Sequence, residues 1–179
     1  AYLERIFETM DEPVDVKDAD DAYEMPDIKG EVEYRDVTFA YEEGKNILEN
    51  VSFTVKPGES IALVGPTGAG KTTIVNLLSR FYDLTGGAVY IDGNDISKVT
   101  LHSLREKMGI MMQDSFIFSG TIEDNIRYGK LDATEEEIRA AAKTVCADEF
   151  IMGLENGYKT EMYEGGSQLS GGQRQLVSF

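Results

Sequence analysis

Residues 65–72 read Gly-Pro-Thr-Gly-Ala-Gly-Lys-Thr, a complete G-x-x-x-x-G-K-[ST] phosphate-binding loop, and this stretch decides the fold. The β-type residues 60–64 before it predict a strand, and the apolar-periodic residues 73–81 after it predict an α-helix. A helix that starts at such a loop turns its unpaired N–H groups and the positive end of its dipole toward an anion. The unit therefore predicts a site for a nucleoside triphosphate.

The residue types in this loop each have a chemical reason. We expect the glycines at 65, 68 and 70 to adopt left-handed backbone angles, which bring successive N–H groups close to phosphate oxygens. Lys71 is expected to place its ammonium on the β- and γ-phosphates, and Thr72 to offer its hydroxyl to Mg²⁺. The alternative, a glycine-rich turn that merely opens a helix, explains the flanking strand and helix less well.

The composition indicates a soluble globular chain. It has 179 residues, of which 41% are hydrophobic and 28% charged, which is enough for one core with an appended subdomain. No stretch approaches the roughly 20 apolar residues of a membrane span, and the start lacks a signal-peptide pattern. The single Cys146 cannot form an internal disulfide, which favours a reducing cytosol, and we interpret it as an ordinary helix residue.

The net charge of −16 argues against nucleic acid as the main partner, because binding a phosphate backbone needs a positive surface. It also disfavours adsorption to an anionic membrane face. Much of the acidic excess lies in residues 8–24, where Lys17 is the one opposing charge, and Pro13 and Pro26 lie near the ends of this block. Such a block of like charges is typical of a solvated linker.

The remaining patterns predict these elements: a helix over 1–10, a hairpin of strands over 31–41 and 51–55, a strand over 88–91, a turn over 92–95, a helix from Thr100 to Lys107, a buried strand over 108–112, and helices over 121–128, 134–146 and 148–153. The last long helix opens with a capping box made by Thr134 and Glu137. We interpret residues 115–168 as a helical subdomain inserted into a mixed sheet layer.

A second motif stands near the C-terminus. Ser170, Gly171 and Gly172 directly precede a predicted helix, so that a hydroxyl, two flexible N–H groups and a helix N-terminus come together as another anion site. Taken alone, the motif could equally be an ordinary capped helix start.

The phosphate loop and, about a hundred residues later, the Leu-Ser-Gly-Gly-Gln of residues 169–173 together resemble the nucleotide-binding domain of ATP-binding cassette (ABC) transporters. The resemblance covers nearly the whole chain. It implies an α/β P-loop NTPase (RecA-like) core with an antiparallel β subdomain and an inserted helical subdomain, incomplete at the C-terminus. The expected divisions are 1–29 (end of a membrane-domain helix plus acidic linker), 30–114 (β subdomain and core), 115–168 (helical subdomain) and 169–179 (signature motif and its helix).

The resemblance also implies roles for named residues. Tyr41 stands where the family stacks an aromatic on adenine, although an aromatic at a strand end is otherwise plain packing. Gln113 matches the Q-loop glutamine, which reaches Mg²⁺ and the attacking water. The implied ATP contacts are Tyr41, Gly65, Pro66, Thr67, Gly68, Ala69, Gly70, Lys71, Thr72, Thr73 and Gln113, with Lys71 and Gln113 catalytic and Thr72 and Gln113 on the metal. Ser170, Gly171, Gly172 and Gln173 would contact the ATP held by a second cassette.

Two stretches look like the exporter branch of the family. Residues 113–122 are similar to the exporter version of the Q-loop, and residues 3–8 are similar to the cytosolic end of an exporter's last membrane helix. The resemblance implies membrane helices fused N-terminal to the cassette, a second cassette as partner, and a place at the cytoplasmic face of the cell membrane. Residues 161–166 fall where exporters carry the X-loop, but Tyr163 and Gly165 depart from the usual Gly and Arg.

Three alternatives compete with this interpretation. A soluble twin-cassette ATPase acting on nucleic acid or the ribosome is opposed by the acidic charge and the opening helix, and coiled-coil chromosome-type members are excluded by the motif spacing. A non-hydrolysing regulatory cassette of an asymmetric dimer stays open. A small P-loop kinase would have no reason to carry residues 169–173.

The sequence printed here stops at Phe179, before the family's Walker B strand and switch histidine. We therefore expect these 179 residues by themselves to hydrolyse ATP at no more than a trace rate, and to leave apolar surface and a strand edge uncovered. No residue indicates which substrate is transported.

Overall fold

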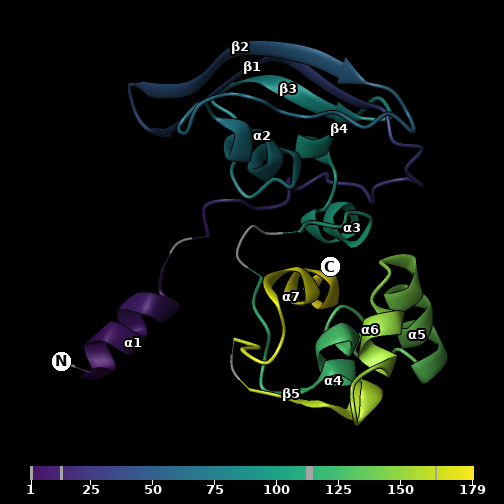
Figure 1. The fold of residues 1–179 in the computed structure, drawn as a ribbon. Coiled ribbons are helices and arrows are strands. Elements are labelled where there is room, and N and C mark those ends of the chain that lie inside the picture. The colour runs from purple at the N-terminus through teal and green to yellow at the C-terminus, as the bar shows by residue number, and fades with distance from the viewer. Residues whose placement is uncertain (1, 13, 112–114, 164) are drawn as a thin grey trace. The chain divides into compact units, whose positions relative to one another are not determined.

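The computed structural model describes residues 2–12, 14–111, 115–163 and 165–179 (Figure 1). The chain divides into two compact units, unit 1 over Ala1–Met108 and unit 2 over Gly109–Phe179. Unit 1 carries the phosphate loop and unit 2 carries the signature motif.

The chain opens with helix α1 (Tyr2–Met10), which confirms the helix expected over 1–10. Its apolar residues recur at helical spacing and are exposed: Leu3 by 69%, Ile6 by 53%, Phe7 by 58% and Met10 by 73%. This stripe is uncovered by the residues that the structure describes.

Unit 1 is built on an antiparallel sheet. Strands β1 (Val32–Glu42), β2 (Lys45–Val55), β3 (Gly86–Ile91) and β4 (Asn94–Asp95) lie in the order β2-β1-β3-β4. The expected β1–β2 hairpin is confirmed, with Val32 opposite Val55 and Glu42 opposite Lys45. The turn between β3 and β4 is the two-residue Asp92-Gly93, both with positive φ (49° and 77°), which suits the right-handed twist of the strands.

One face of this sheet packs on helix α2 (Lys71–Leu78), as Figure 1 shows. The 3-10 helix η1 (Ile96–Lys98) and helix α3 (Leu101–Glu106) follow β4. Thr100 caps α3 as expected, because its hydroxyl accepts a hydrogen bond from the Ser103 N–H. The buried apolar core comprises Met25, Tyr34, Val37, Phe39, Leu48, Leu77, Val89, Ile91, Ile96, Val99 and Leu104.

The acidic segment that precedes β1 is not solvated throughout, contrary to our expectation. Met25 is buried and its N–H donates to the Ser103 hydroxyl at 2.8 Å, while Tyr23 forms a parallel bridge with Val99. Asp20 and Glu24 remain exposed. The segment docks through backbone hydrogen bonds and one buried apolar side chain. The charge pattern of a sequence predicts neither of these contacts.

Unit 2 is mainly helical and confirms the helices expected there. It contains α4 (Ile122–Arg127), α5 (Glu135–Thr144), α6 (Asp148–Met152) and α7 (Gly171–Ser178), with the 3-10 helix η2 (Gly157–Lys159) and the short pair β5 (Gly120–Thr121) and β6 (Glu161–Met162). The capping box of Thr134 and Glu137 is present. The core of the unit comprises Ile117, Ile122, Ala133, Ile138, Ala142, Ala147, Ile151, Tyr158, Met162, Leu169 and Val177.

Two expected strands do not form in the described part of the chain. Residues 60–64 and 108–111 have no strand pairing, and Met112 lies outside the described residues. Val64 is 93% exposed and Ile61 53%. A parallel strand buried in a sheet needs hydrogen-bonded neighbours, and the described residues supply none for these stretches.

Asp92 generates a stability prediction. Its carboxylate accepts hydrogen bonds from the N–H groups of Lys29 (2.6 Å), Gly30 (3.2 Å) and Glu31 (2.9 Å). Burial opposes ionisation, but these N–H groups outweigh it and hold the pKa of Asp92 below its ordinary value of 3.8. The ionised carboxylate therefore stabilises the fold above about pH 3.8, and this contribution is lost as the pH falls through the lower folded pKa.

We expect Asp92→Asn to lower the free energy of unfolding at pH 7 by about 1–2 kcal/mol, because an amide cannot satisfy all three donors. Below pH 4 the difference from the wild type should shrink. Urea unfolding at a series of pH values measures both effects. Asp20→Asn, which makes the same change at an exposed position of the acidic segment before β1, is the matched control. Identical stability curves for the two variants would contradict the anchoring role of Asp92.

Candidate nucleotide site

The phosphate loop joins residue 64 to the start of α2. Gly68 and Gly70 adopt left-handed φ values of 84° and 82°, as expected, and Gly70 is the N-cap of α2. The expectation for Gly65 was wrong, because its φ is not in the left-handed region. A side chain at Gly65 would instead be crowded, since an added Cβ would lie 3.2 Å from the Cβ of Ala69.

Strand β2 packs against the end of the loop at Gly70. An added Cβ at Gly70 would lie 2.7 Å from Cδ2 of Leu48, a distance that real Cβ contacts do not show. Leu48 itself is buried in the core of unit 1. The sequence does not reveal Leu48 as a supporting residue, because a contact between segments more than twenty residues apart leaves no local pattern.

The ammonium of Lys71 lies folded over the loop. Its Nζ donates to the carbonyl oxygens of Gly65 and Pro66, both at 2.8 Å. Neutral carbonyls are weaker acceptors than phosphate oxygens, so a bound triphosphate can take over this cation. Thr72 is exposed in the first turn of α2, where its hydroxyl can meet a ligand, whereas Thr73 is buried.

Tyr41 lies beside the loop at the end of β1. Its hydroxyl is 3.2 Å from Oγ1 of Thr73, and its ring meets Phe39 and Tyr82 edge-on, with centroids 4.8 Å and 5.0 Å apart. The side chain nevertheless remains 48% exposed. Packing therefore fixes the ring next to the first turn of α2, while leaving it able to meet a planar ligand. Gln113, the other expected nucleotide contact, lies outside the described residues.

The signature motif forms the start of α7. Ser170 is the N-cap, and it exchanges hydrogen bonds with Gln173: Oγ accepts from the Gln173 N–H at 3.3 Å and the Ser170 N–H donates to Oε1 at 2.9 Å. Leu169 is buried, and its carbonyl accepts from Arg174 at 2.8 Å. The motif is therefore a rigid helix start.

Nothing among the described residues requires glycine at either of the motif's two glycine positions. An added Cβ at Gly172 would meet nothing within 4 Å, and at Gly171 only the Arg174 guanidinium at 3.9 Å. Neither has a left-handed φ, and both are exposed. Neither the backbone angle nor the packing of the described residues therefore explains why glycine stands at these positions.

The segment expected to be the X-loop begins with β6, which pairs with β5. Tyr163 is 71% exposed, and Glu164 lies outside the described residues. Gly165 and Gly166 both have positive φ values (78° and 59°), and an added Cβ at Gly166 would lie 2.9 Å from Ile117. The tight turn explains why glycine stands at 165, where an arginine would be strained.

Comparison with known proteins decides the family. The family model described as "ABC transporter" matches residues 48–179. This chain belongs to the ABC transporter family. The expected fold class is thereby confirmed as an ABC-type ATP-binding domain of mixed α/β structure on a P-loop core, the ATPase domain type of these transporters.

Several relatives are much longer than this chain. The uncharacterized ABC transporter ATP-binding protein YfiC of Bacillus subtilis is 51% identical over 179 residues, which are 100% of this chain and 30% of that protein. Human ATP-binding cassette sub-family B member 6 is 46% identical over 177 residues, 99% of this chain and 21% of its own length.

A solved structure of a bacterial Atm1-family ABC exporter with ATP bound matches with a TM-score of 0.88 and 43% identity, covering 98% of this chain and 31% of the exporter. The chain thus spans about a third or less of each of these relatives. None of the described helices is long and apolar enough to cross a bilayer.

The tight contact at Gly70 yields a prediction. Gly70→Ala should lower the free energy of unfolding by about 2 kcal/mol, because it adds both backbone strain and a collision with Leu48. It should also weaken binding of a fluorescent ATP analogue by about tenfold or more, since the loop must shift.

Gly44→Ala is the matched control, because Gly44 has nearly the same φ of 80° but an added Cβ there meets nothing within 4 Å. We expect it to cost about 1 kcal/mol of stability and to leave nucleotide affinity unchanged. An equal loss of nucleotide affinity in both variants would show that the contact with Leu48 does not determine the conformation of the phosphate loop.

Proposed function

We propose that this chain is the ATP-binding cassette of an exporter, which couples ATP binding and hydrolysis to movement of a substrate across a membrane. Two such cassettes would pair head to tail, so that the phosphate loop of one faces the signature motif of the other. The observation that carries the proposal is the pair of exposed glycines, Gly171 and Gly172, because neither the backbone angles nor the packing of the described residues requires glycine there.

The proposed nucleotide site is the loop over 65–73 with Tyr41 at its side. The backbone N–H groups of the loop and of the first turn of α2 would bind the phosphates, and Lys71 would leave the carbonyls of Gly65 and Pro66 for the β- and γ-phosphates. Tyr41 would stack on the adenine ring. These groups bind and orient the triphosphate for attack by water in line with the leaving group.

The residues also fit a magnesium ion. Within the described residues, no cluster of His, Cys, Asp and Glu could hold a metal by itself. Mg²⁺ in phosphate sites uses few protein ligands, all oxygens, and completes its shell with phosphate and water. The Thr72 hydroxyl and the Gln113 amide oxygen are ligands of that kind. When bound, Mg²⁺ neutralises negative charge on the phosphate oxygens.

The signature motif would act on the nucleotide of the partner cassette. Each chain carries two separate anion sites, and a two-fold axis lets two chains clamp two phosphate tails from both sides. Ser170, Gly171, Gly172 and Gln173 would approach the γ-phosphate through their backbone and side-chain donors. Loss of the γ-phosphate would weaken this clamp, which converts hydrolysis into opening of the pair.

The remaining partner would be a membrane domain fused N-terminal to the cassette. The relatives are more than three times longer than the aligned region, and one of them is described as an exporter. The exposed apolar stripe of α1 (Leu3, Ile6, Phe7 and Met10) supports a neighbour on that side of the chain. We therefore place the cassette at the cytoplasmic face of a membrane and propose no nucleic-acid partner.

Replacing Lys71 tests the nucleotide site. In the full-length transporter, Lys71→Ala should weaken ATP binding or lower ATP turnover by about a hundredfold or more, because the cation on the β- and γ-phosphates is lost. Lys45→Ala, which removes an exposed hairpin lysine paired with Glu42, should change neither. Undiminished ATPase activity of the Lys71 variant would refute the assignment of this loop.

Replacing Gly171 tests the contact in trans. Gly171→Asp adds a carboxylate at the first position of α7. There it interacts favourably with the positive end of the helix dipole but repels a phosphate. In the full-length transporter we expect ATP affinity within about threefold of the wild type and a turnover number at least about tenfold lower.

The control is Ala140→Asp, which adds the same charge at an exposed position of α5. It should leave both quantities unchanged. If Gly171→Asp weakened ATP binding as strongly as it slowed turnover, the motif would act in its own chain and the proposed pairing would be wrong.

A further inference from the structure

Residues 17–31, which we call the strap, pack against the rest of unit 1. The Tyr23 N–H donates to the Lys98 carbonyl at 3.1 Å, and the Tyr23 carbonyl accepts from the Thr100 N–H at 2.9 Å. Asp18 accepts from the Leu101 N–H at 2.7 Å, at the start of α3. With the Met25 and Asp92 contacts, these bonds tie the strap to η1, α3 and the β3–β4 turn.

The beginning of the strap is held by Arg80, which follows the C-terminus of α2. The Arg80 side chain is only 6% exposed. It donates to Asp83 at 3.1 Å, to the carbonyls of Ile96 (3.4 Å) and Val99 (3.2 Å), and, through its other terminal nitrogen, to the Lys17 carbonyl at 2.8 Å. One planar cation thus joins the end of α2, the η1 region and the strap.

Arg80 stands at a helix end whose backbone conformation favours glycine. Arg80 has a left-handed φ of 50°, and its N–H donates to the Leu77 carbonyl while the Phe81 N–H donates to the Asn76 carbonyl. This is the Schellman helix end, at which glycine is the unstrained residue. An arginine here costs backbone strain, which its side-chain bonds offset.

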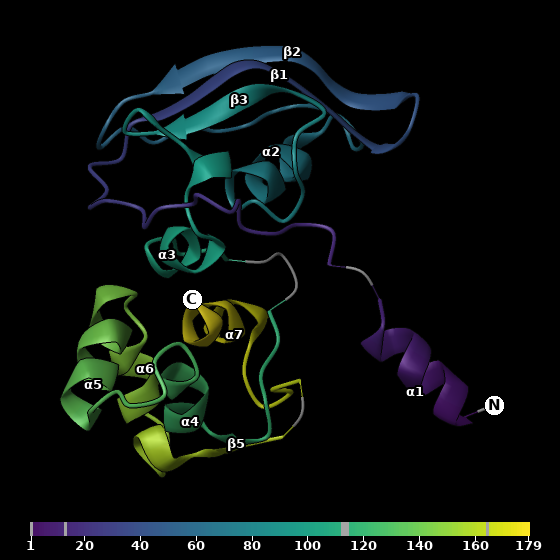
Figure 2. The same cartoon turned by 180° about the vertical axis from the view of Figure 1, so that it is seen from behind.

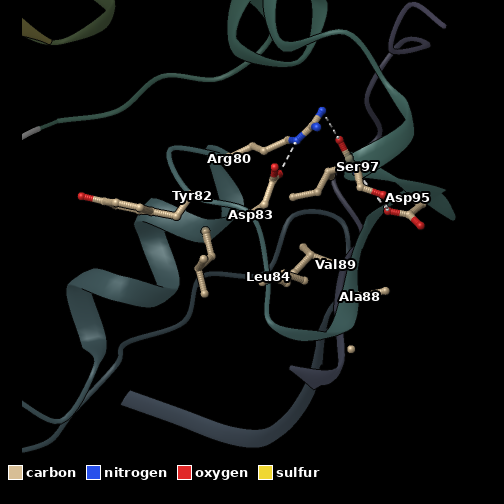
Figure 3. Close-up of a pocket in the computed structure, with 11 residues that line it drawn as sticks. Arg80, Tyr82, Asp83, Leu84, Ala88, Val89, Asp95 and Ser97 are labelled. Carbon is tan, nitrogen blue, oxygen red and sulfur yellow. Dashed lines mark hydrogen bonds and ion pairs between the residues drawn. The ribbon is translucent and has the colours of Figure 1, made fainter. Parts of the chain in front are cut away.

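Figure 3 shows Arg80 beside a cavity of about 280 Å³, with its guanidinium turned toward Asp83 and away from the apolar wall made by Leu84 and Val89. The guanidinium donates its hydrogen bonds to Asp83 and to backbone carbonyls of this same chain. Arg105 reinforces the same point from α3, because it donates to the carbonyls of Ser79 (3.1 Å) and Arg80 (2.7 Å). Arg80 therefore fixes parts of the chain relative to one another.

Helix α2 connects this junction to the phosphate loop. It is eight residues long, so its N-cap Gly70 and its C-cap Ser79 lie at the two ends of one short rigid rod. The backbone hydrogen bonds of so short a helix hold it as one unit, so a displacement at its start is carried to its end. The end of the rod carries Arg80, and Arg80 holds the strap.

We propose that Arg80 is a positioning residue that couples occupancy of the phosphate loop to the docking of the strap. Through it, the nucleotide state would reach the chain that precedes residue 17, by a route separate from the signature motif. This inference rests on the proposed function, since it assumes that the loop binds and releases ATP.

Hydrogen exchange followed by mass spectrometry on the full-length transporter tests the coupling. The probe is the slowly hydrolysed analogue ATPγS with Mg²⁺, and the readout is exchange of the strap amides, among them those of Tyr23 and Met25, which are donors in the docked strap. In the wild type we expect nucleotide to change strap exchange by about fivefold or more. In Arg80→Gly and Arg80→Lys, ATPγS affinity should stay within about threefold and the strap response should vanish.

The two variants separate positioning from folding. Glycine is unstrained at this helix end but removes the guanidinium hydrogen bonds to the strap. Lysine keeps the positive charge but cannot form the same set of hydrogen bonds as the planar guanidinium. Arg35→Lys, at an arginine that pairs with Glu33 on the same strand, is the matched control and should respond like the wild type. Asp92→Asn should loosen the far end of the strap without abolishing the response.

The outcomes are distinct. A strap response that persists in both Arg80 variants, or strap amides that exchange freely in the wild type without nucleotide, would overturn the coupling while leaving the proposed function intact. Absence of ATPγS binding to the wild type would overturn the proposed function and the coupling with it. If the Arg80 variants lost ATPγS affinity together with the strap response, Arg80 would be a structural residue only, and the coupling would again be overturned.

Discussion

The close approach of Gly70 to Leu48 is the contact on which the rest of unit 1 depends. It brings the start of α2 against β2 with no room for a side chain, and it does so at a left-handed φ that favours glycine. The loop before this point takes its curvature from that position, and the helix after it covers one face of the sheet (Figure 2). The same contact therefore joins the loop that we propose to bind phosphate to the hydrophobic core of unit 1.

The second proposed site, at the signature motif, differs from the first in how its glycines are packed. At the start of α7 the serine caps its own helix, while Gly171 and Gly172 are exposed, and no neighbour in the described part of the chain would forbid a side chain there. Residues whose type is unexplained by their own chain are the ones to assign to a partner. The chain is 43% identical to a solved ABC exporter with ATP bound, and the partner that we propose is a second cassette. Pairing and transport remain proposals, because this chain spans only part of its relatives.

Local signals were enough to predict most of the elements. The alternating residues before Tyr41 predicted the hairpin of β1 and β2, Asp92-Gly93 predicted a turn, and the capping box of Thr134 predicted the start of α5, because in each case the information lies within a few residues. The strand over 60–64 could not be judged in this way, since it depends on neighbours that the described residues do not provide. Docking of the acidic strap and the role of Arg80 were also missed, because both rest on backbone carbonyls brought together from distant segments. The roles expected for the nucleotide contacts stay predictions, and Gln113 lies outside the described residues.

The central claim is that two copies of the cassette share each nucleotide between a phosphate loop and a signature motif. An experimental structure of the complete transporter, closed on ATP and Mg²⁺ with hydrolysis blocked, measures this most directly. The account predicts that the N–H of Gly171 lies within about 3.5 Å of a γ-phosphate oxygen of the ATP held by the partner's phosphate loop. A closed complex in which Gly171 and Ser170 lie more than about 10 Å from every phosphate oxygen, beyond the reach of any hydrogen bond, would contradict it.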